Sequence, residues 1–214
     1  MTKISEIKLA VFDFDATIMD GETINFLAKA VNVEEEVSKI THLAMMGEMD
    51  FFESLIKRVS LLKGLSEKKV NDVCQNLPII NGAKELVNYL KHNKVTVVCL
   101  SGGFKNATEP ICKKLGFDAS FSNTLHAKNG VLTGLVGGEM MFSDSKGIMI
   151  NKIQNLLNID SSQTLVCGDG ANDISMCKYA SLKVAFCAKD ALKKVCNYHI
   201  EDKDLSQIIN IFEI

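Results

Sequence analysis

The feature that most constrains the fold is an alternation of short apolar runs with longer helical patterns along the chain. The apolar runs are Leu9–Phe12, Val95–Leu100, Thr164–Cys167 and Lys183–Phe186. Their length suits strands that are covered on both faces. Helical periodicity follows over residues 83–92, 106–115, 146–157 and 173–179. This alternation predicts an α/β fold with a doubly wound, mostly parallel, Rossmann-like sheet that binds ligands at the carboxyl ends of its strands.

Two segments interrupt this rhythm. Residues 18–77 contain no strand pattern but carry helical patterns over 34–46, 50–62 and 66–74. Asp50 followed by Glu53 resembles a capping box, and Ser66 is a candidate N-cap. We therefore predict a helical cap domain over residues 18–77, inserted into a core of residues 1–17 and 78–214. Turn residues among short apolar pieces over 119–139 predict a β-hairpin.

Composition excludes several classes of protein. Hydrophobic residues make up 47% and charged residues 23% of the 214, as in an ordinary folded globule. The formal net charge of −2 argues against nucleic-acid binding. No apolar run approaches the roughly 20 residues of a membrane span. The seven cysteines contain no C-x-x-C pair, and the first residues show no signal-peptide core, which predicts reduced thiols in a cytoplasmic protein.

Two carboxylates follow the first predicted strand. Asp13 and Asp15 stand in the sequence Asp-Phe-Asp-Ala-Thr directly after Leu9–Phe12. Side chains two residues apart at a strand end project to the same side, so both can meet one ligand. Like charges held this close repel each other, and a divalent cation is the usual remedy. The motif alone leaves open a simple turn or helix cap.

A second acidic pair follows the strand Thr164–Cys167. Asp169 and Asp173 lie in Gly-Asp-Gly-Ala-Asn-Asp, where glycines allow a sharp turn and close approach of the backbone to a ligand. Two carboxylate pairs at strand ends of one sheet favour a Mg²⁺ site, because Mg²⁺ prefers a few carboxylate oxygens together with water and phosphate. A glycine-rich turn with Asp as an N-cap is the alternative.

Two weaker signals concern phosphate binding. Ser101 and Gly102 begin the sequence Ser-Gly-Gly-Phe between the strand Val95–Leu100 and the next helix. A hydroxyl and bare backbone amides at a helix N-terminus form a natural phosphate cradle. Lys146 begins a later helical pattern, where a lysine is most often a solvated surface residue.

The order of these motifs resembles that of the haloacid dehalogenase superfamily of phosphohydrolases. The shared order is Asp-x-Asp-x-Thr, then Ser after a strand, then Lys, then Gly-Asp-Gly-x-x-Asp. The similarity covers nearly the whole chain, and residues 21–24, 57–62, 101–104 and 168–176 look like those of members that hydrolyse O-phospho-L-serine, the last step of serine biosynthesis. One departure is Ala16, where those members usually have Ser. We expect the backbone there to matter more than the side chain.

The resemblance implies a role for each motif residue. Asp13 would be the nucleophile that forms an aspartyl phosphate, and Asp15 the acid that protonates the serine oxygen and later the base that activates water. The implied cofactor is Mg²⁺, held by Asp13, the carbonyl of Asp15 and Asp169, with Asp173 ordering its water shell. The residues expected to bind the phosphoryl group and place the substrate are Ser101, Gly102, Lys146 and Asn172.

Selectivity would come from the cap. By the resemblance, Arg58 binds the substrate carboxylate and Glu22 its ammonium group, while Met45 and Phe51 close over the substrate. From the residues alone, Arg58 with Lys57 could equally form a basic helix face, and Met45 and Phe51 could be ordinary cap core.

The leading hypothesis is thus a Mg²⁺-dependent enzyme that hydrolyses O-phospho-L-serine, acting as a monomer or homodimer. The nearest alternatives are a phosphatase for another phosphomonoester and a phosphotransferase that uses serine or homoserine. A phospho-acceptor signalling module belongs to a different class. Such modules also use paired acids and a lysine, but they need no helical cap.

Overall fold

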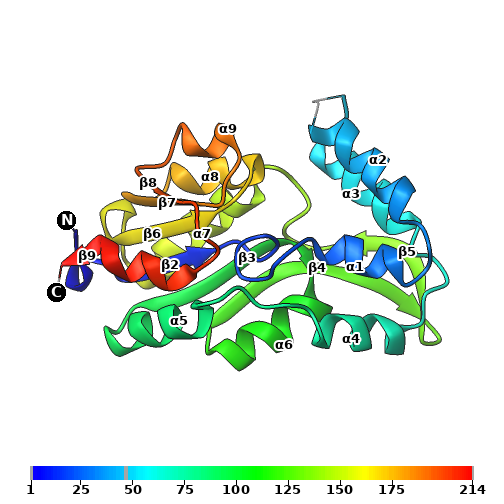
Figure 1. Cartoon of the computed structure of the whole chain (residues 1–214), viewed down its shortest axis with the longest axis horizontal. Helices are drawn as coiled ribbons and strands as arrows, with labels where there is room; N and C mark the ends of the chain where they lie inside the picture. Colours follow the sequence, from blue (N-terminus) through cyan, green and yellow to red (C-terminus); the bar gives the residue numbers. More distant parts are fainter. Residues whose placement is uncertain (1, 46–47, 214) are drawn as a thin grey trace.

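The computed structural model describes the backbone of residues 2–45 and 48–213 and is built around a seven-stranded sheet of spatial order β5-β4-β3-β2-β6-β7-β8 (Figure 1). Its strands are β2 (Leu9–Phe12), β3 (Thr96–Phe104), β4 (Ala119–Lys128), β5 (Val131–Gly137), β6 (Thr164–Gly168), β7 (Leu182–Phe186) and β8 (Tyr198–Ile200). Only the β4–β5 pair is antiparallel in this sheet. The predicted α/β fold with a mostly parallel sheet is therefore confirmed. A separate two-stranded pair joins β1 (Thr2–Lys3) to β9 (Phe212–Glu213).

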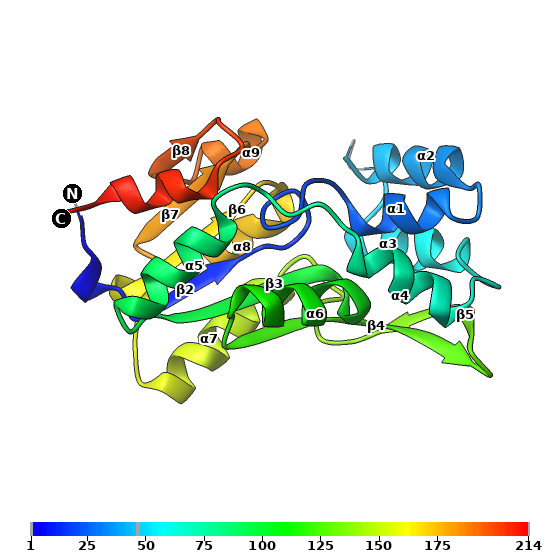
Figure 2. The ribbon, with the colours of Figure 1, turned by 60° about the horizontal axis from the view of Figure 1, so that its bottom comes forward.

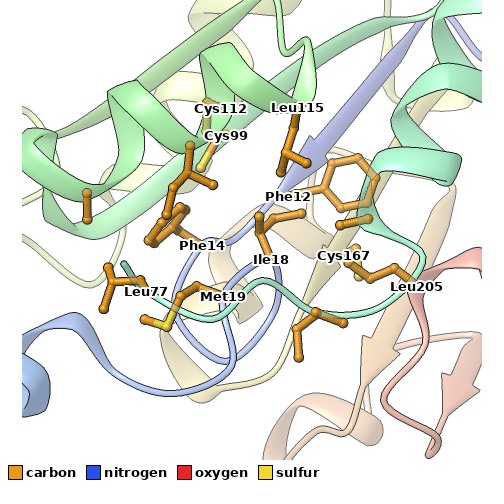
Figure 3. Close-up of a cluster of buried hydrophobic side chains, with 14 of the residues drawn as sticks. Phe12, Phe14, Ile18, Met19, Leu77, Cys99, Cys112, Leu115, Cys167 and Leu205 are labelled. Carbon is orange, nitrogen blue, oxygen red and sulfur yellow. The ribbon is translucent and has the colours of Figure 1, made fainter. Parts of the chain in front are cut away.

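Helices cover both faces of this sheet, which accounts for the short, wholly apolar β2 and the fully buried β6. In β2, Ala10 and Phe12 belong to one buried cluster, while Leu9 and Val11 belong to another. The first cluster includes side chains from α5 (Ala83–His92), α6 (Lys105–Leu115) and the 3₁₀ segment η4 (Leu205–Ile211). Figure 3 shows Phe12, Cys99 and Cys167 of adjacent strands within it. The second cluster packs beneath α7 (Ser145–Leu157), α8 (Ile174–Cys177) and α9 (Asp190–Lys193).

Four further helices lie at the end of the molecule opposite the chain termini (Figures 1 and 2). They are α1 (Thr23–Lys29), α2 (Glu34–Met45), α3 (Phe51–Ser60) and α4 (Glu67–Gln75). The Asp50 side chain accepts a hydrogen bond from the Glu53 N–H at 2.9 Å. Ser66 accepts one from the Lys69 N–H at 3.2 Å. Asp50 and Ser66 therefore cap their helices as expected, but the capping box is only half formed among the described residues, because the Glu53 side chain pairs with Lys57. Among the described residues, no helix is long and apolar enough to cross a membrane.

The predicted hairpin is present, but it belongs to the main sheet. β4 pairs parallel with β3 on one side and antiparallel with β5 on the other. β3 also differs from expectation, because it continues through Ser101 and Gly102 to Phe104, where a turn was expected. The pairing shifts register between Leu100 and Phe104, and the glycines give the strand the freedom for this irregularity.

Smaller differences concern helix boundaries and cysteines. The segment expected as a helix over 173–179 begins earlier, as the 3₁₀ turn η3 (Ala171–Asp173), and continues as α8. The cysteines are all free thiols. Five of them are buried, and Cys187 and Cys196 are partly buried, which agrees with the expectation of largely buried cysteines.

Candidate active site

The register of three parallel strands brings the acidic motifs to one place. Phe12 at the end of β2 lies opposite Cys99 of β3 and opposite Cys167 of β6. Asp13 and Asp169 therefore leave the same edge of the sheet. Carboxylate oxygens of Asp13, Asp169 and Asp173 all lie within 4.8 Å of one another. The arrangement can hold a metal ion, because hard divalent cations are bound by clustered carboxylate oxygens.

Lys146 lies inside this acidic cluster. Its Nζ is 2.5 Å from Asp13 Oδ1 and 2.6 Å from Asp173 Oδ1, and its side chain is only 4% exposed. A lysine at the start of a helix usually lies in solvent. Lys146 is buried because the first turn of α7 faces the carboxyl edge of β6. The other Asp173 oxygen accepts hydrogen bonds of 3.0 Å from the backbone N–H groups of Asp169 and Gly170. Both carboxylate oxygens of Asp173 are thus bound by the chain itself.

Burial and mutual repulsion dominate the electrostatics of the cluster. Burial, reinforced by the charge of Asp173, raises the pKa of Asp13 well above its usual range against the opposing effect of Lys146. Burial and Asp173 also raise the pKa of Asp169 to about 6. Burial alone would lower the pKa of Lys146, but the adjacent carboxylates of Asp13 and Asp173 outweigh it and hold the pKa above its normal value. More positive charge is needed to keep every carboxylate ionised, and a divalent cation would supply it.

Asp15 is oriented by a residue that the sequence reasoning missed. Its Oδ1 accepts hydrogen bonds from the Thr23 N–H at 2.8 Å and from the Thr23 hydroxyl at 2.6 Å. Burial raises the pKa of Asp15, and these two bonds oppose that increase. The second oxygen, Oδ2, faces β3, since a Cβ added to Gly103 would lie 2.7 Å from it. Thr23 lies in the stretch 21–24 that resembles the family, but that resemblance gave it no role of its own.

The loop between Asp15 and Thr23 contains Ala16, the position where similar family members usually have Ser. Ala16 has a φ of 54°, in the left-handed region, and its N–H donates to the Gly21 carbonyl at 2.8 Å. Such a backbone costs a non-glycine residue about 1–2 kcal/mol. The loop adopts this conformation with alanine in place, and the small effect expected of the Ala16 side chain stays a prediction.

A cavity of about 510 Å³ lies between the carboxyl edge of the sheet and helices α1–α3. The predicted site residues that line it are Asp13, Asp15, Glu22, Phe51, Arg58, Gly102, Asp169 and Asn172. Ser101 is buried beside them, and its hydroxyl accepts a hydrogen bond from the Gly103 N–H at 2.9 Å. Met45 ends α2, but its side chain lies outside the described part of the structure. Further lining residues that the sequence reasoning did not single out include Ser54 and Lys189.

Helix α3 sends two neighbouring basic residues in different directions. Lys57 forms an ion pair with Glu53 at 2.7 Å, and both side chains are about half exposed. Arg58 lines the cavity, and its Nε donates to the Ser54 carbonyl at 3.3 Å. The two residues do not form a common basic face, so Arg58 is available to a ligand in the cavity.

Glu22 and Phe51 line the same cavity as Arg58. Burial, followed by the charges of Asp15 and Asp169, raises the pKa of Glu22 to about 8, with Arg58 acting in the opposite direction. The Phe51 ring lies close to Gly102, because a Cβ on that glycine would come within 2.8 Å of Phe51 Cζ. The cavity is therefore lined by the acidic cluster, with Lys146 and Lys189 near it, and by a cation, a further acid and an aromatic ring from the helical side.

Comparisons with known proteins agree with this fold. The model of the haloacid dehalogenase-like hydrolase family matches residues 7–181. The chain belongs to this family, as its motif order predicted.

Within the family, the chain is similar to phosphoserine phosphatases. The phosphoserine phosphatase of Campylobacter jejuni subsp. doylei is 51% identical over 205 residues, which are 96% of this chain and 99% of the relative. A substrate-bound phosphoserine phosphatase complex superposes with a TM-score of 0.92 at 44% identity, covering 97% of this chain and 99% of that one. A phospho-aspartyl intermediate analogue of phosphoserine phosphatase gives a TM-score of 0.91 at 44% identity, covering 100% of both chains.

Proposed function

We propose that this chain is a phosphoserine phosphatase that hydrolyses O-phospho-L-serine to L-serine and phosphate. The observation that carries the proposal is the shared cavity. Asp13, Asp15 and Asp169 lie at one end, and Arg58 and Glu22 lie on the wall that α3 and α1 contribute. A substrate with phosphate, carboxylate and ammonium groups matches this distribution of charge. The similarity to phosphoserine phosphatases along nearly the whole chain supports the same reading.

In the first step, Asp13 attacks phosphorus, the bond from phosphorus to the serine oxygen breaks, and an aspartyl phosphate forms. Asp15 donates a proton to the departing serine oxygen. Its raised pKa favours the protonated form that this step needs. In the second step, Asp15 takes a proton from water, the water oxygen attacks phosphorus, and Asp13 is released. Lys146, at 2.5 Å from Asp13, provides positive charge next to the transferred group.

The cofactor in this proposal is Mg²⁺. The carboxylates of Asp13 and Asp169 and the backbone carbonyl of Asp15 would hold it, since they offer the hard oxygen ligands that Mg²⁺ prefers. Asp173 suits a supporting role, because its oxygens are already bonded to Lys146 and to two backbone N–H groups. When bound, the cation supplies the charge that lets an anionic phosphate approach a carboxylate.

Substrate selection is assigned to residues 18–77, which we propose as the cap, with residues 1–17 and 78–214 as the core. Arg58 binds the carboxylate and Glu22 the ammonium group, while Phe51 and Met45 exclude water above them. The residues that bind the phosphoryl group and place the substrate in this proposal are Ser101, Gly102, Lys146 and Asn172. We further propose a cytoplasmic enzyme that acts as a monomer or homodimer, in line with its free cysteines.

A phosphate-release panel tests the function. It contains phosphoserine, phosphothreonine and sugar phosphates, each with and without magnesium, and phosphoserine with homoserine as an added acceptor. We expect metal-dependent release from phosphoserine above all, and none from the Asp13→Asn variant. Undiminished turnover by Asp13→Asn would refute the mechanism. Transfer of phosphate to homoserine in place of its release would favour a phosphotransferase.

The matched pair Arg58→Ala and Lys57→Ala tests selectivity. Arg58 lines the cavity, whereas Lys57 pairs with Glu53 on the outer side of the same helix. We expect Arg58→Ala to weaken activity on amino-acid phosphates alone, and Lys57→Ala to leave activity on every substrate unchanged. A uniform loss over all phosphomonoesters in Arg58→Ala would argue for another substrate.

A further inference from the structure

Ser54, in the middle of α3, has a buried hydroxyl without a hydrogen-bond partner. The residue is 0% exposed and forms part of the cavity wall. Its Oγ makes no hydrogen bond to any of the described residues. A buried polar group in this state is uncommon in folded proteins and calls for a specific explanation.

The ordinary way to satisfy a helical serine is not used here. Such a side chain usually bonds a backbone carbonyl three or four residues earlier in its helix. Ser60, on the same helix, does so by donating to the Lys57 carbonyl at 2.7 Å. At Ser54, the carbonyl of Asp50 accepts only the backbone N–H, at 3.0 Å. The Ser54 hydroxyl therefore keeps an unused donor at the cavity wall, although its oxygen is not exposed to the cavity.

The neighbour of Ser54 indicates which chemical group that is. Arg58 lies one helical turn further along, lines the same cavity and donates its Nε–H to the Ser54 carbonyl at 3.3 Å. This contact holds the guanidinium against the backbone of the residue that carries the free hydroxyl. A hydroxyl donor beside a guanidinium suits a carboxylate, whose two oxygens accept several hydrogen bonds at once.

Burial without a partner is not sufficient for this argument. The Thr17 hydroxyl also lacks a partner among the described residues, but Thr17 is absent from the cavity wall. Ser54 combines the free hydroxyl, the cavity position and an adjacent cation. We propose that Ser54 is a substrate-binding residue that donates its hydroxyl to the same carboxylate as Arg58. This inference rests on the proposed function.

The test compares Ser54→Ala with Ser60→Ala, a serine of the same helix whose hydroxyl bonds only the backbone. We expect Ser54→Ala to raise the KM for phosphoserine about tenfold while kcat stays within about twofold, since a hydrogen bond to a remote charged group contributes to binding only. The inhibition constant for inorganic phosphate, which has no carboxylate, should not change. The Tm should equal or exceed that of the wild type, because alanine removes an unsatisfied hydroxyl. Ser60→Ala should leave KM unchanged.

Three results would overturn the proposal. They are a KM within about twofold of the wild type, an inhibition constant for phosphate that rises in parallel with KM, and a rise in KM accompanied by a lower Tm.

Placing Ser54→Ala in an Arg58→Ala background should raise KM by a smaller factor than in the wild type, because the two residues share one ligand group. Failure of the proposed function would be seen separately, as absence of phosphoserine turnover by the wild-type protein.

Discussion

Thr23 controls the orientation of Asp15 through two hydrogen bonds to one carboxylate oxygen, Oδ1. Because this oxygen already accepts two bonds, the proposed mechanism places the transferred proton of Asp15 on Oδ2, which lies toward Gly103 of β3. In the proposed mechanism Thr23 is a positioning residue, since it would act on the substrate through Asp15. It also follows Glu22, so the proposed ligand of the ammonium group and the residue that orients Asp15 are consecutive in sequence.

The first prediction concerns the Thr23 hydroxyl. Thr23→Val should lower kcat on phosphoserine roughly 10- to 100-fold with little change in KM, because a misdirected general acid forfeits part of its usual contribution of about 10²–10⁴-fold. Thr23→Ser should restore most of kcat. The control is Thr108→Val, which removes another buried hydroxyl bond, the 2.7 Å contact between Thr108 and Ser122. A Thr23→Ser variant as slow as Thr23→Val would contradict this role.

The second prediction follows from the raised pKa of Glu22. A carboxyl with a pKa of about 8 is largely protonated at neutral pH and attracts an ammonium group weakly. As pH rises toward 8 the carboxylate forms, so the KM for phosphoserine should fall between about pH 6 and 8. Glu22→Gln, which cannot ionise, should have a higher KM that hardly varies over this interval. Parallel profiles for the two proteins would show that another group governs binding.

At the scale of elements, the end of β6 depends on the absence of a side chain at Gly168. A Cβ there would overlap the carboxylate of Asp173, which accepts two backbone hydrogen bonds beneath the motif. We expect Gly168→Ala to displace Asp173 and with it Lys146. Activity should fall by on the order of 100-fold, as for other displacements of about 1 Å at reacting groups.

The control for this third prediction is Gly137→Ala in β5. A Cβ at Gly137 meets nothing within 4 Å, so that variant should keep wild-type activity. Steady-state kinetics and magnesium titrations of both variants provide the measurement. Full activity in Gly168→Ala would mean that the Asp173 carboxylate has room to move without consequence.

Elements also show what the sequence could and could not predict. The central strands and the motif residues at their ends were predicted because apolar runs and acidic turns are local patterns. The extension of β3 to Phe104 was missed, since a strand with two glycines depends on pairing with β4. Thr23 and Ser54 were missed for a similar reason. Thr23 is important because it bonds to Asp15 across a loop, and Ser54 because its hydroxyl has no partner among the described residues. The spacing of residues along the sequence predicts neither property.

Several acidic side chains are buried in the folded molecule, and burial disfavours their charged forms. The pKa of Asp169 is raised to about 6 and that of Glu22 to about 8. In this range of pH the unfolded chain has already released protons that the folded protein still holds. Rising pH therefore favours unfolding of the metal-free protein from about pH 4 to about pH 8.

The fourth prediction is that magnesium counteracts this effect. A cation bound only to the folded state stabilises it according to its concentration relative to Kd. Magnesium should raise Tm more at pH 8 than at pH 5, because more of its carboxylate ligands are ionised there. Thermal unfolding with and without a chelator measures the shift, and Asp169→Asn should abolish most of it. An equal shift in that variant would place the cation elsewhere.

The register of β2 with β3 and β6 also determines which deletions and insertions this chain tolerates. Because successive side chains on a strand point to opposite faces, deleting one residue from β2 would invert its entire pattern and withdraw Asp13 from its partners at the same time. Insertions in the loops that join α1 to α2 and α3 to α4 displace none of these strands. Variation during evolution is therefore expected to accumulate in those loops, while the groups of phosphoryl transfer stay fixed by the spacing of three neighbouring strands.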